Sequence, residues 1–349
     1  MKIAVAGTID TPIRASSSAG TEIWTYNFCQ ELVKQGHKVI LFADSSSQVD
    51  GEVVPVCRHS DLLESKGQIS KSKLAIFSFE QIIKIAQKQK EFDLIQISIF
   101  SFPYILPAIN LFTKPVFITV HGSGMNYDDA ALFFKLYPSP HYIFSSQSFA
   151  DGWPQPKNSK IIPHGIKIED FKYSAATDDY FFWMSRISPE KRVEDAIAFA
   201  KKTGHNLIIA GPIRNQEYYT KIVQPNLNNK IRYVGELNLK QKIQYYQKAK
   251  AFIFTAKPPE AFGLVVVEAL ACGAPVIAYD IGAMPEIIKN RNNGFLVKPG
   301  HIEGLIQAVK KIDTIDREKC RDSIKGHFDI DQMIDKYLKY YSEIINQKK

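Results

Sequence analysis

The sequence predicts an α/β protein built from two doubly wound domains. Short, nearly continuous apolar runs alternate with amphipathic helical segments along almost the whole chain, and a Pro/Gly break at 161–165 interrupts the alternation once. Strand–helix alternation produces parallel sheets covered by helices. At 349 residues the chain is also long enough for two domains of ordinary size.

The first half carries five candidate strands, which are β-branched or aromatic and nearly uninterrupted, as expected of strands buried on both faces. They are Ile3–Ala6, Val39–Ala43, Leu94–Ile99, Val116–Val120 and Tyr142–Phe144. A helix is predicted between the first two, from about Gly20 to Gln35. Trp24, Phe28 and Leu32 recur there on one helical face, and Gly36 follows as a C-terminal glycine.

The second half repeats this rhythm after the break. Its candidate strands are Tyr180–Met184, Leu207–Ala210, Ile231–Val234, Ala251–Phe254, Val276–Ala278 and Phe295–Val297. The last segment, Asp331–Asn346, is predicted as a helix whose apolar residues lie on one face and need a surface to cover.

Cysteine usage and apolar segments bear on where the protein works. The four cysteines stand far apart without a C-x-x-C pair, which favours a reducing compartment and argues against a disulfide framework or structural zinc. The apolar start of the chain is too short for a signal peptide, and the stretch 97–112 is too short and too rich in proline to cross a bilayer. We therefore expect a cytoplasmic protein.

The formal net charge is +8. A basic balance is typical of proteins that bind nucleic acid, anionic membrane surfaces or small phosphorylated ligands. The lysines are spread along the chain, with a local cluster within 66–90, and the sequence has neither an arginine-rich block nor a nucleic-acid motif. We expect no nucleic-acid partner, and we leave open a weak, peripheral association with the inner face of a membrane.

A basic motif follows the first strand of the second half, at the kind of position where doubly wound domains bind ligands. Ser188-Pro189 is a good helix start, which places Lys191 in the first helical turn, where the helix dipole disfavours a cation. A bound anion would reverse that effect, so Arg186 and Lys191 are a candidate clamp for a diphosphate. On this motif alone, a solvated basic turn that pairs with Glu190 or Glu194 is an equal alternative.

A second motif, Glu260-Ala-Phe-Gly-Leu-Val-Val-Val-Glu268, follows the predicted strand Ala251–Phe254. We assign Glu260 to a loop and Glu268 to a helix. Gly263 lets the backbone pass close to a ligand and leaves the helix N-terminus open to phosphate. Glu260 is then a candidate for holding sugar hydroxyls and Glu268 for holding a ribose diol. The alternative is a buried helix with one capping and one exposed glutamate.

The two motifs together resemble the family-4 retaining glycosyltransferases, which have the GT-B fold. The span from Glu260 to Glu268 matches the E-x7-E signature of that family, and Arg186 with Lys191 matches its arginine–lysine pair. Similar segments extend along essentially the whole chain: Ala19-Gly20-Thr21-Glu22, Thr119-Val120-His121-Gly122, Pro163-His164-Gly165-Ile166 and Ile208-Ile209-Ala210-Gly211-Pro212.

The resemblance implies an α/β protein of GT-B architecture, with two Rossmann-like doubly wound domains facing a central cleft. An N-terminal domain over 1–162 would bind the acceptor, and a C-terminal domain over 163–328 would bind the nucleotide sugar. A terminal helix within 329–349 would cross back to the N-terminal domain.

The resemblance also implies roles for individual residues. The catalytic candidates are His121, at the transferred sugar; Arg186 and Lys191, on the diphosphate; and Glu260, on sugar hydroxyls. The further donor-binding candidates are Gly20, near the phosphate and the sugar; Gly211; Gly235, Glu236 and Leu237, lining the base pocket; Phe262; Gly263 and Leu264, with backbone N–H groups on the phosphate; and Glu268, on the ribose.

Some positions depart from the family pattern. Ser185 and Arg192 stand where the family has glycine, before the arginine and after the lysine, and Ala19 replaces one loop glycine. None of these changes removes a charged group. The Ala19 side chain is expected to leave less space on the acceptor side of the site. His164 in place of the family's asparagine is expected to be neutral.

Other candidate sites are weaker. Without the family, His121 is more simply interpreted as a satisfied core histidine. Asp329-Ile330-Asp331 spells the D-x-D pattern of metal-dependent transferases, but it stands at a helix start, where aspartate is a capping residue. Gly7 opens no G-x-G-x-x-G string, which argues against a nicotinamide site.

We therefore predict a retaining hexosyltransferase that moves a sugar from a UDP- or GDP-sugar to a sugar, lipid-linked or small-molecule acceptor. Such a reaction belongs to glycan, lipopolysaccharide or glycoconjugate biosynthesis. We predict that it needs neither a metal nor another cofactor. The alternatives are a catalytically silent sugar-nucleotide-binding subunit and a sugar-nucleotide epimerase on the same fold.

Overall fold

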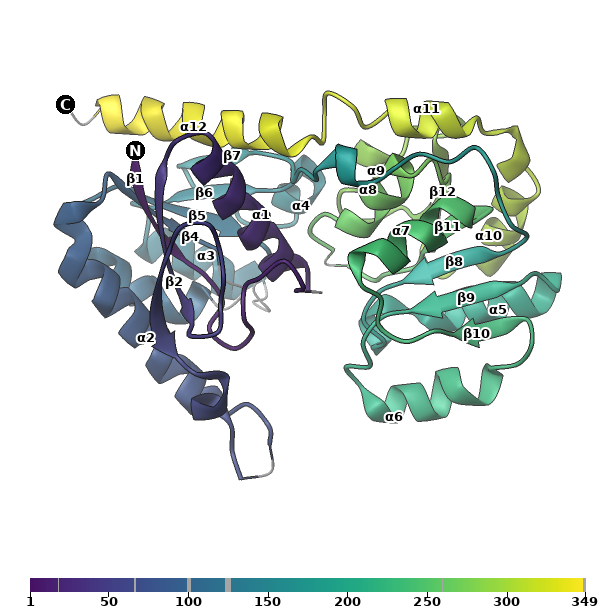
Figure 1. Cartoon of the computed structure of the whole chain (residues 1–349), viewed down its shortest axis with the longest axis horizontal. Helices are drawn as coiled ribbons and strands as arrows, with labels where there is room; N and C mark the ends of the chain where they lie inside the picture. The colour runs from purple at the N-terminus through teal and green to yellow at the C-terminus, as the bar shows by residue number, and fades with distance from the viewer. Residues whose placement is uncertain (18, 66, 99–101, 123–126, 259, 348–349) are drawn as a thin grey trace. The chain divides into compact units, whose positions relative to one another are not determined.

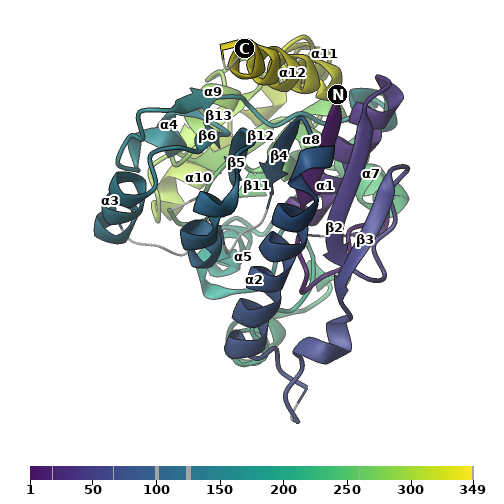
Figure 2. The same cartoon turned by 90° about the vertical axis from the view of Figure 1, so that its left-hand side faces the viewer.

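The computed structural model describes residues 1–17, 19–65, 67–98, 102–122, 127–258 and 260–347 (Figure 1, Figure 2). The chain folds as two compact units. Unit 1 consists of Met1–His164 and Ile330–Lys349, and unit 2 consists of Gly165–Asp329. Each unit is a parallel sheet packed with helices, the arrangement that the strand–helix alternation predicts.

The sheet of unit 1 has seven strands in the order β3-β2-β1-β4-β5-β6-β7, and every neighbouring pair is parallel. The strands are β1 Lys2–Ala6, β2 Lys38–Asp44, β3 Glu52–Cys57, β4 Leu94–Ile97, β5 Val116–Val120, β6 His141–Phe144 and β7 Ser159–Ile161. The sequence did not predict the two edge strands. β3 is half exposed and contains Pro55, and β7 has three half-buried residues, so neither carries a continuous apolar run. The prediction for β4 extended to Ile99, which lies outside the described residues.

The α-helices of unit 1 are α1 Gly20–Lys34, α2 Lys71–Lys88, α3 Tyr127–Leu136, α4 Gln147–Asp151 and α12 Ile330–Gln347, with 3-10 helices at η1 His59–Leu62, η2 Gln89–Glu91 and η3 Phe102–Leu111. The terminal helix α12 covers this sheet together with α1. The Trp24 indole N–H donates to Sδ of Met333 at 3.3 Å, and the Tyr341 hydroxyl donates to Oε1 of Gln96 at 2.6 Å. The buried side chains of α12, including Met333 and Tyr341, therefore form part of the core of unit 1.

The sheet of unit 2 has six strands in the order β10-β9-β8-β11-β12-β13, all parallel. They are β8 Phe181–Met184, β9 Leu207–Ala210, β10 Ile231–Tyr233, β11 Ala251–Phe254, β12 Val276–Tyr279 and β13 Gly294–Val297. The α-helices are α5 Val193–Thr203, α6 Gln216–Tyr218, α7 Leu239–Lys248, α8 Leu264–Ala271, α9 Met284–Ile287, α10 Ile302–Val309 and α11 Arg317–Asp322. The shorter 3-10 and π segments are η4 Ile168–Asp170, η5 Pro189–Lys191, η6 Tyr219–Val223, η7 Gln224–Asn226 and η8 Ile312–Thr314.

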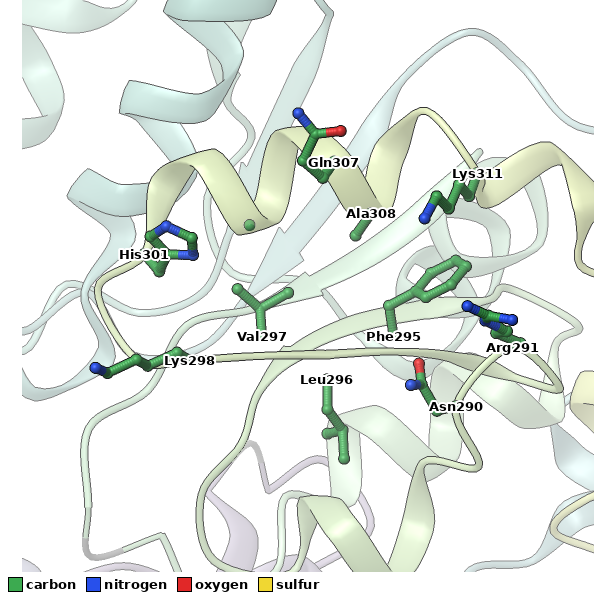
Figure 3. A pocket seen from close by; sticks show the side chains of 11 residues that line it. Asn290, Arg291, Phe295, Leu296, Val297, Lys298, His301, Gln307, Ala308 and Lys311 are labelled. Carbon is green, nitrogen blue, oxygen red and sulfur yellow. The ribbon is translucent and has the colours of Figure 1, made fainter.

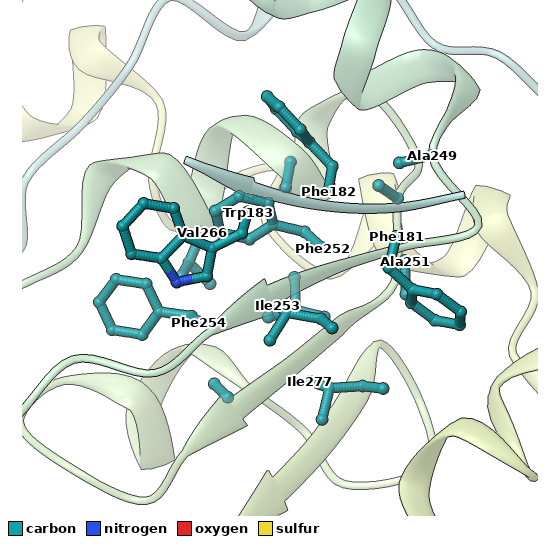
Figure 4. Close-up of a cluster of buried hydrophobic side chains, with 14 of the residues drawn as sticks. Phe181, Phe182, Trp183, Ala249, Ala251, Phe252, Ile253, Phe254, Val266 and Ile277 are labelled. Atoms are coloured by element: carbon teal, nitrogen blue, oxygen red, sulfur yellow. The ribbon is translucent and has the colours of Figure 1, made fainter. Parts of the chain in front are cut away.

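The central strands β8 and β11 of unit 2 are packed in an aromatic core (Figure 4). Phe182, Trp183 and Phe252 are buried there with Val266 of α8. The Trp183 indole N–H donates to the Thr255 hydroxyl at 2.9 Å, directly after β11. The core therefore fixes the carboxyl ends of both strands, from which the two charged motifs begin.

None of the helices in the described part of the chain combines the length and apolar character that crossing a bilayer requires.

Candidate functional site

The basic motif after β8 forms a single 3-10 turn instead of the first turn of α5. Ser188 and Pro189 are its N-cap and first residue, as predicted, but the turn ends at Lys191. Arg192 then adopts left-handed backbone with φ 49°, and α5 begins at Val193. Lys191 therefore lies in a helical turn that begins at Pro189, as predicted, but this turn is a separate 3-10 segment, because the left-handed Arg192 separates it from α5.

Arg192 stands at a position where the family usually has glycine, and its backbone is in the left-handed region. The left-handed region costs a residue with a Cβ roughly 1–2 kcal/mol. Two contacts hold it there: its guanidinium donates to both carboxylate oxygens of Asp195, at 2.5 and 2.8 Å, and its carbonyl oxygen accepts from the Thr255 hydroxyl at 2.9 Å. Tyr279 donates to the same aspartate at 2.6 Å. These contacts of Asp195, Thr255 and Tyr279 stabilise a left-handed backbone conformation that glycine would adopt without strain.

Arg186 lies at the surface, with its side chain half exposed, and its guanidinium is 3.6 Å from Oε1 of Glu190. The Ser188 hydroxyl donates to that oxygen at 2.6 Å. Burial opposes ionisation of Glu190, but this hydrogen bond and the charges of Arg186 and Lys191 hold its pKa below the usual value. The pairing with Glu190 that the sequence left as an alternative is present for Arg186, and the exposed guanidinium is accessible to a ligand.

Lys191 and Glu260 join the two sequence motifs. The Lys191 ammonium donates to Oε2 of Glu260 at 2.5 Å, and both side chains are largely buried. A backbone hydrogen bond of 2.7 Å from Lys257 N–H to the Glu190 carbonyl ties the same two loops together. The sequence assigned these side chains to a diphosphate and to a sugar, and the structure shows that they are direct partners.

Two glycines set the path of the loop before α8. Gly263 is the N-cap of α8 with φ 83°, and a Cβ there would approach Cε of Met284 to 2.9 Å. Gly282, with φ 48°, lies against the Glu260 carbonyl, and its Cβ would come within 2.0 Å of that oxygen. The first N–H groups of α8, including that of Leu264, have no acceptor within the helix, so this end suits an anion. Gly282 was not predicted, because a glycine after β12 carries no motif.

Glu268 lies inside unit 2, on α8, and faces α7. Its Oε1 accepts from the Lys242 ammonium at 2.6 Å, and its Oε2 accepts from the Tyr246 hydroxyl at 3.1 Å. Burial, followed by the charge of Glu268, raises the pKa of Tyr246 well above its usual value. A ribose at Glu268 would have to share the carboxylate with these donors. Lys242 and Tyr246 were missed by sequence reasoning, although their i,i+4 spacing places them on one face of α7.

The remaining donor-binding candidates of unit 2 lie in neighbouring loops. Gly211 has φ 125°, and a Cβ there would come within 2.0 Å of the Ser185 carbonyl, so it lets the β9 end approach the basic motif. Its N–H donates to the Gly235 carbonyl at 2.8 Å. Glu236 is exposed and Leu237 is half-buried in the same loop, ahead of α7. Phe262 is buried and stacks edge-on against Phe328, which places it in the core instead of on a ligand surface.

His121 and Gly20 belong to unit 1. The His121 ring lies 4.8 Å from Trp24 and 5.3 Å from His164, and its Nε2 is buried without a hydrogen-bond partner among the residues that the structure describes. Burial lowers the pKa of His121 to about 3, so the ring is neutral at physiological pH. Gly20 is the first residue of α1, and a Cβ there would meet nothing within 4 Å.

The D-x-D aspartates do not act as a pair. Asp329 Oδ2 accepts from the Gly326 N–H at 2.5 Å, and Asp331 lies 3.6 Å from the Lys34 ammonium on α1. Over the described ranges, no three His, Cys, Asp or Glu side chains are grouped so that they could hold a metal ion.

A pocket of about 280 Å³ lies between β13 and α10 of unit 2 (Figure 3). Its basic lining residues are Arg291, Lys298, His301 and Lys311. None of the predicted site residues lines it, so the motif residues and this pocket are separate features of unit 2.

Two family models match the chain. Glycosyltransferase Family 4 matches residues 18–170, and Glycosyl transferases group 1 matches residues 166–326. The chain is 25% identical over 179 residues to N-acetyl-alpha-D-glucosaminyl L-malate synthase of Bacillus anthracis, covering 48% of this chain and 46% of that protein. It is 29% identical over 190 residues to a probable sucrose-phosphate synthase of Thermosipho melanesiensis, covering 50% and 44%. These matches span less than half the length of each relative.

Similar solved structures cover nearly the whole chain. Sucrose-phosphate synthase of Thermosynechococcus elongatus superimposes with a TM-score of 0.80 at 17% identity, over 99% of this chain and 100% of that chain. Anabaena HepE in complex with UDP and glucose superimposes with a TM-score of 0.78 at 19% identity, over 98% and 99%. These structures establish the predicted GT-B fold. Because the two family models together span residues 18–326, the chain belongs to the group 1, family-4 glycosyltransferases.

Proposed function

We propose that this glycosyltransferase is a retaining enzyme whose nucleoside diphosphate sugar binds at the carboxyl ends of β8 and β11. The observation that carries the proposal is the ion pair between Lys191 and Glu260, which joins both family motifs just before the N-terminus of α8. Cations and free backbone N–H groups in one place are what a diphosphate requires.

Each residue of the proposed site has a separate role. Arg186 and Lys191 stabilise the charge that grows on the departing diphosphate, aided by N–H groups of Gly263 and Leu264. Lys191 is already oriented by Glu260, so the ammonium needs little reorganisation when phosphate arrives. Glu260 is then available to a sugar hydroxyl. His121, which is neutral, serves the transferred sugar without acting as a cation.

Anabaena HepE has been solved with UDP and with UDP-glucose, which favours a UDP-sugar as the first donor to test against GDP-sugars. The acceptor that we propose is a sugar, a lipid-linked sugar or a small molecule, and the reaction uses no metal and no further cofactor. We place the enzyme in the cytoplasm, with a peripheral association at the inner face of the membrane.

Release of UDP or GDP from a panel of nucleotide sugars tests the proposal. We expect Lys191→Ala to lower the rate by about 100-fold or more, the size of effect typical of losing one charge-stabilising donor. Lys202→Ala is the matched control, because it removes a lysine from an exposed ion pair with Glu303 in the same unit. Nucleotide binding without release from any donor would instead identify a silent binding subunit.

A further inference from the structure

The pocket between β13 and α10 lies at the edge of the sheet of unit 2 (Figure 3). β13 is the last strand of that sheet and pairs with β12 on one side only. Phe295 and Val297 of β13 form the apolar middle of the pocket. On the helix side, Gly304 and Ala308 present little side chain. The pocket is therefore a space of about 280 Å³ with an apolar floor.

Basic side chains stand at both ends of this pocket. Lys298 and His301 lie at one end and Arg291 and Lys311 at the other, with the apolar middle between them (Figure 3). All four side chains belong to exposed residues. In the part of the chain that the structure describes, none of them forms an ion pair with a carboxylate.

The acidic residues around the pocket do not neutralise these charges. Glu303 of α10 lies 2.5 Å from the Lys202 ammonium, and Asp313 lies 3.1 Å from that of Lys250. Asp280, after β12, is exposed and binds β13 through its backbone N–H. A concave surface that carries charge of one sign without counter-charges attracts ligands of the opposite sign. The pocket therefore suits an anion.

Arg291 provides a second indication of a ligand. Its backbone is left-handed, with φ 66°, a conformation that costs a residue with a Cβ roughly 1–2 kcal/mol. At Arg192 the same conformation is stabilised by Asp195 and Thr255. The Arg291 guanidinium, in contrast, has no hydrogen-bond partner among the described residues. The strained turn therefore presents a charged side chain to the pocket without using it in the fold.

The lining narrows the class of anion. Guanidinium and ammonium groups bind phosphate through charge-assisted hydrogen bonds. The amides of Asn290 and Gln307 can donate to hydroxyl groups and accept from them. The volume lies below the ~300–1,000 Å³ that is typical of pockets for drug-sized ligands, so it favours a ligand smaller than a nucleotide sugar. Cations at both ends favour a ligand with two anionic groups.

We propose that the β13–α10 pocket binds a small sugar that carries two phosphate groups. One phosphate binds at the end formed by Arg291 and Lys311, and the other binds at the end formed by Lys298 and His301. The sugar lies across the apolar middle. This site shares no residue with the motifs assigned to the donor, and the proposal does not depend on the transfer reaction.

Isothermal titration calorimetry of the full chain tests the proposal, with fructose 1,6-bisphosphate as the probe. We expect the bisphosphate to bind at least about tenfold more tightly than fructose 6-phosphate, and fructose to bind undetectably. The double variant Arg291→Asn, Lys311→Gln should lower the affinity for the bisphosphate about tenfold or more and abolish its preference over the monophosphate. Asparagine is chosen because it tolerates the left-handed region.

The matched control is the double variant Lys240→Gln, Lys319→Gln, which removes the same charge from exposed positions of unit 2 outside the pocket. It should bind the bisphosphate like the unaltered chain, and so should Lys191→Ala. Circular dichroism establishes that each variant is folded.

Three results would overturn the proposal: no binding of the bisphosphate, equal losses in the pocket and control variants, or a loss confined to Lys191→Ala. The second would indicate unspecific charge attraction, and the third would place the bisphosphate at the diphosphate site. Bisphosphate binding by a chain that releases nucleotide from no donor would count only against the proposed function.

Discussion

Lys191 and Glu260 neutralise each other at the place where a diphosphate would need a cation. Sequence spacing cannot show this pairing, because the residues lie 69 positions apart and belong to different strand ends. The ion pair holds the largely buried Lys191 side chain in one orientation. Arg186, in contrast, lies 3.6 Å from Glu190 at an exposed position, where such ion pairs contribute little to stability.

Replacing Arg186 and Lys191 together by alanine should lower kcat/KM by about 10³-fold or more, because each cation acts on charge that grows during departure of the diphosphate. Steady-state kinetics of the single and double variants measure this, with Lys202→Ala as the control. If the double variant kept its kcat and lost only donor affinity, the pair would bind donor and transition state equally.

Glu268→Gln should lower the free energy of unfolding by about 3–5 kcal/mol, because it leaves the buried Lys242 ammonium without its carboxylate. Adding Lys242→Met should recover much of that loss by removing the unpaired charge. Chemical denaturation measures both effects.

Donor affinity of the double variant separates the two roles of Glu268. If Glu268 also binds the ribose, the variant that combines Glu268→Gln with Lys242→Met should recover its stability but still bind the donor weakly. Full recovery of donor affinity would limit Glu268 to the ion pair with Lys242.

The stability of unit 1 should decrease on acidification. The pKa of His121 falls from 6.5 to about 3 on burial, and burial followed by the charge of His121 holds the pKa of His164 well below its usual value. Below about pH 6.5 the unfolded chain binds protons that the folded chain excludes, so each histidine removes about 1.4 kcal/mol per pH unit down to its folded pKa.

His164→Asn, which restores the family's residue, should reduce this pH slope between about pH 6 and 4. Denaturation midpoints of the variant and the unaltered chain across that range measure the difference. An unchanged slope in the variant would show that His164 is protonated in the folded state.

At the scale of elements, the sequence predicts the strands and helices that have a regular pattern of apolar residues. The strands β8 to β13 and the start of α1 at Gly20 lie where predicted, because buried runs and a glycine boundary are local signals. The edge strands β3 and β7 lack such runs. The left-handed Arg192 was also missed, because its conformation depends on Asp195 and Thr255, contacts that form only in the folded domain.

The site likewise contains residues that local sequence patterns predict and residues that only the folded structure reveals. The motifs predict that Arg186, Lys191, Glu260 and Gly263 lie near one another, since each follows a strand end. They do not reveal Lys242, which is an ordinary lysine until α7 packs on α8. Charge pairs between elements are therefore the part of this site that local sequence patterns leave out.

The terminal helix α12 completes the core of unit 1 through polar as well as apolar contacts. Tyr341→Phe should lower the free energy of unfolding by about 1–3 kcal/mol, because Oε1 of the buried Gln96 loses its donor. Tyr340→Phe, whose hydroxyl contacts the partly exposed His141, should cost less, because water can replace that bond. Equal losses would mean that the buried Gln96 contact contributes no more to stability than the His141 contact.

At the scale of the whole molecule, the two family models divide the chain between them. The model that matches residues 18–170 covers most of unit 1, and the one that matches 166–326 covers nearly all of unit 2. The candidate cations lie in unit 2, and the neutral histidine lies in unit 1.

The most direct test of the central claim is proton NMR of the sugar first released from an α-linked UDP-sugar, with EDTA present. Glu260 and Glu268 each accept from a lysine in unit 2, and the proposal assigns both carboxylates to hydroxyls of the donor instead of the acceptor. The account therefore predicts an α-configured first product, at a rate that EDTA does not change. A β-configured product would rule out retention and direct attention to His121 as the base. Activity lost in EDTA and restored by magnesium or manganese would contradict metal independence.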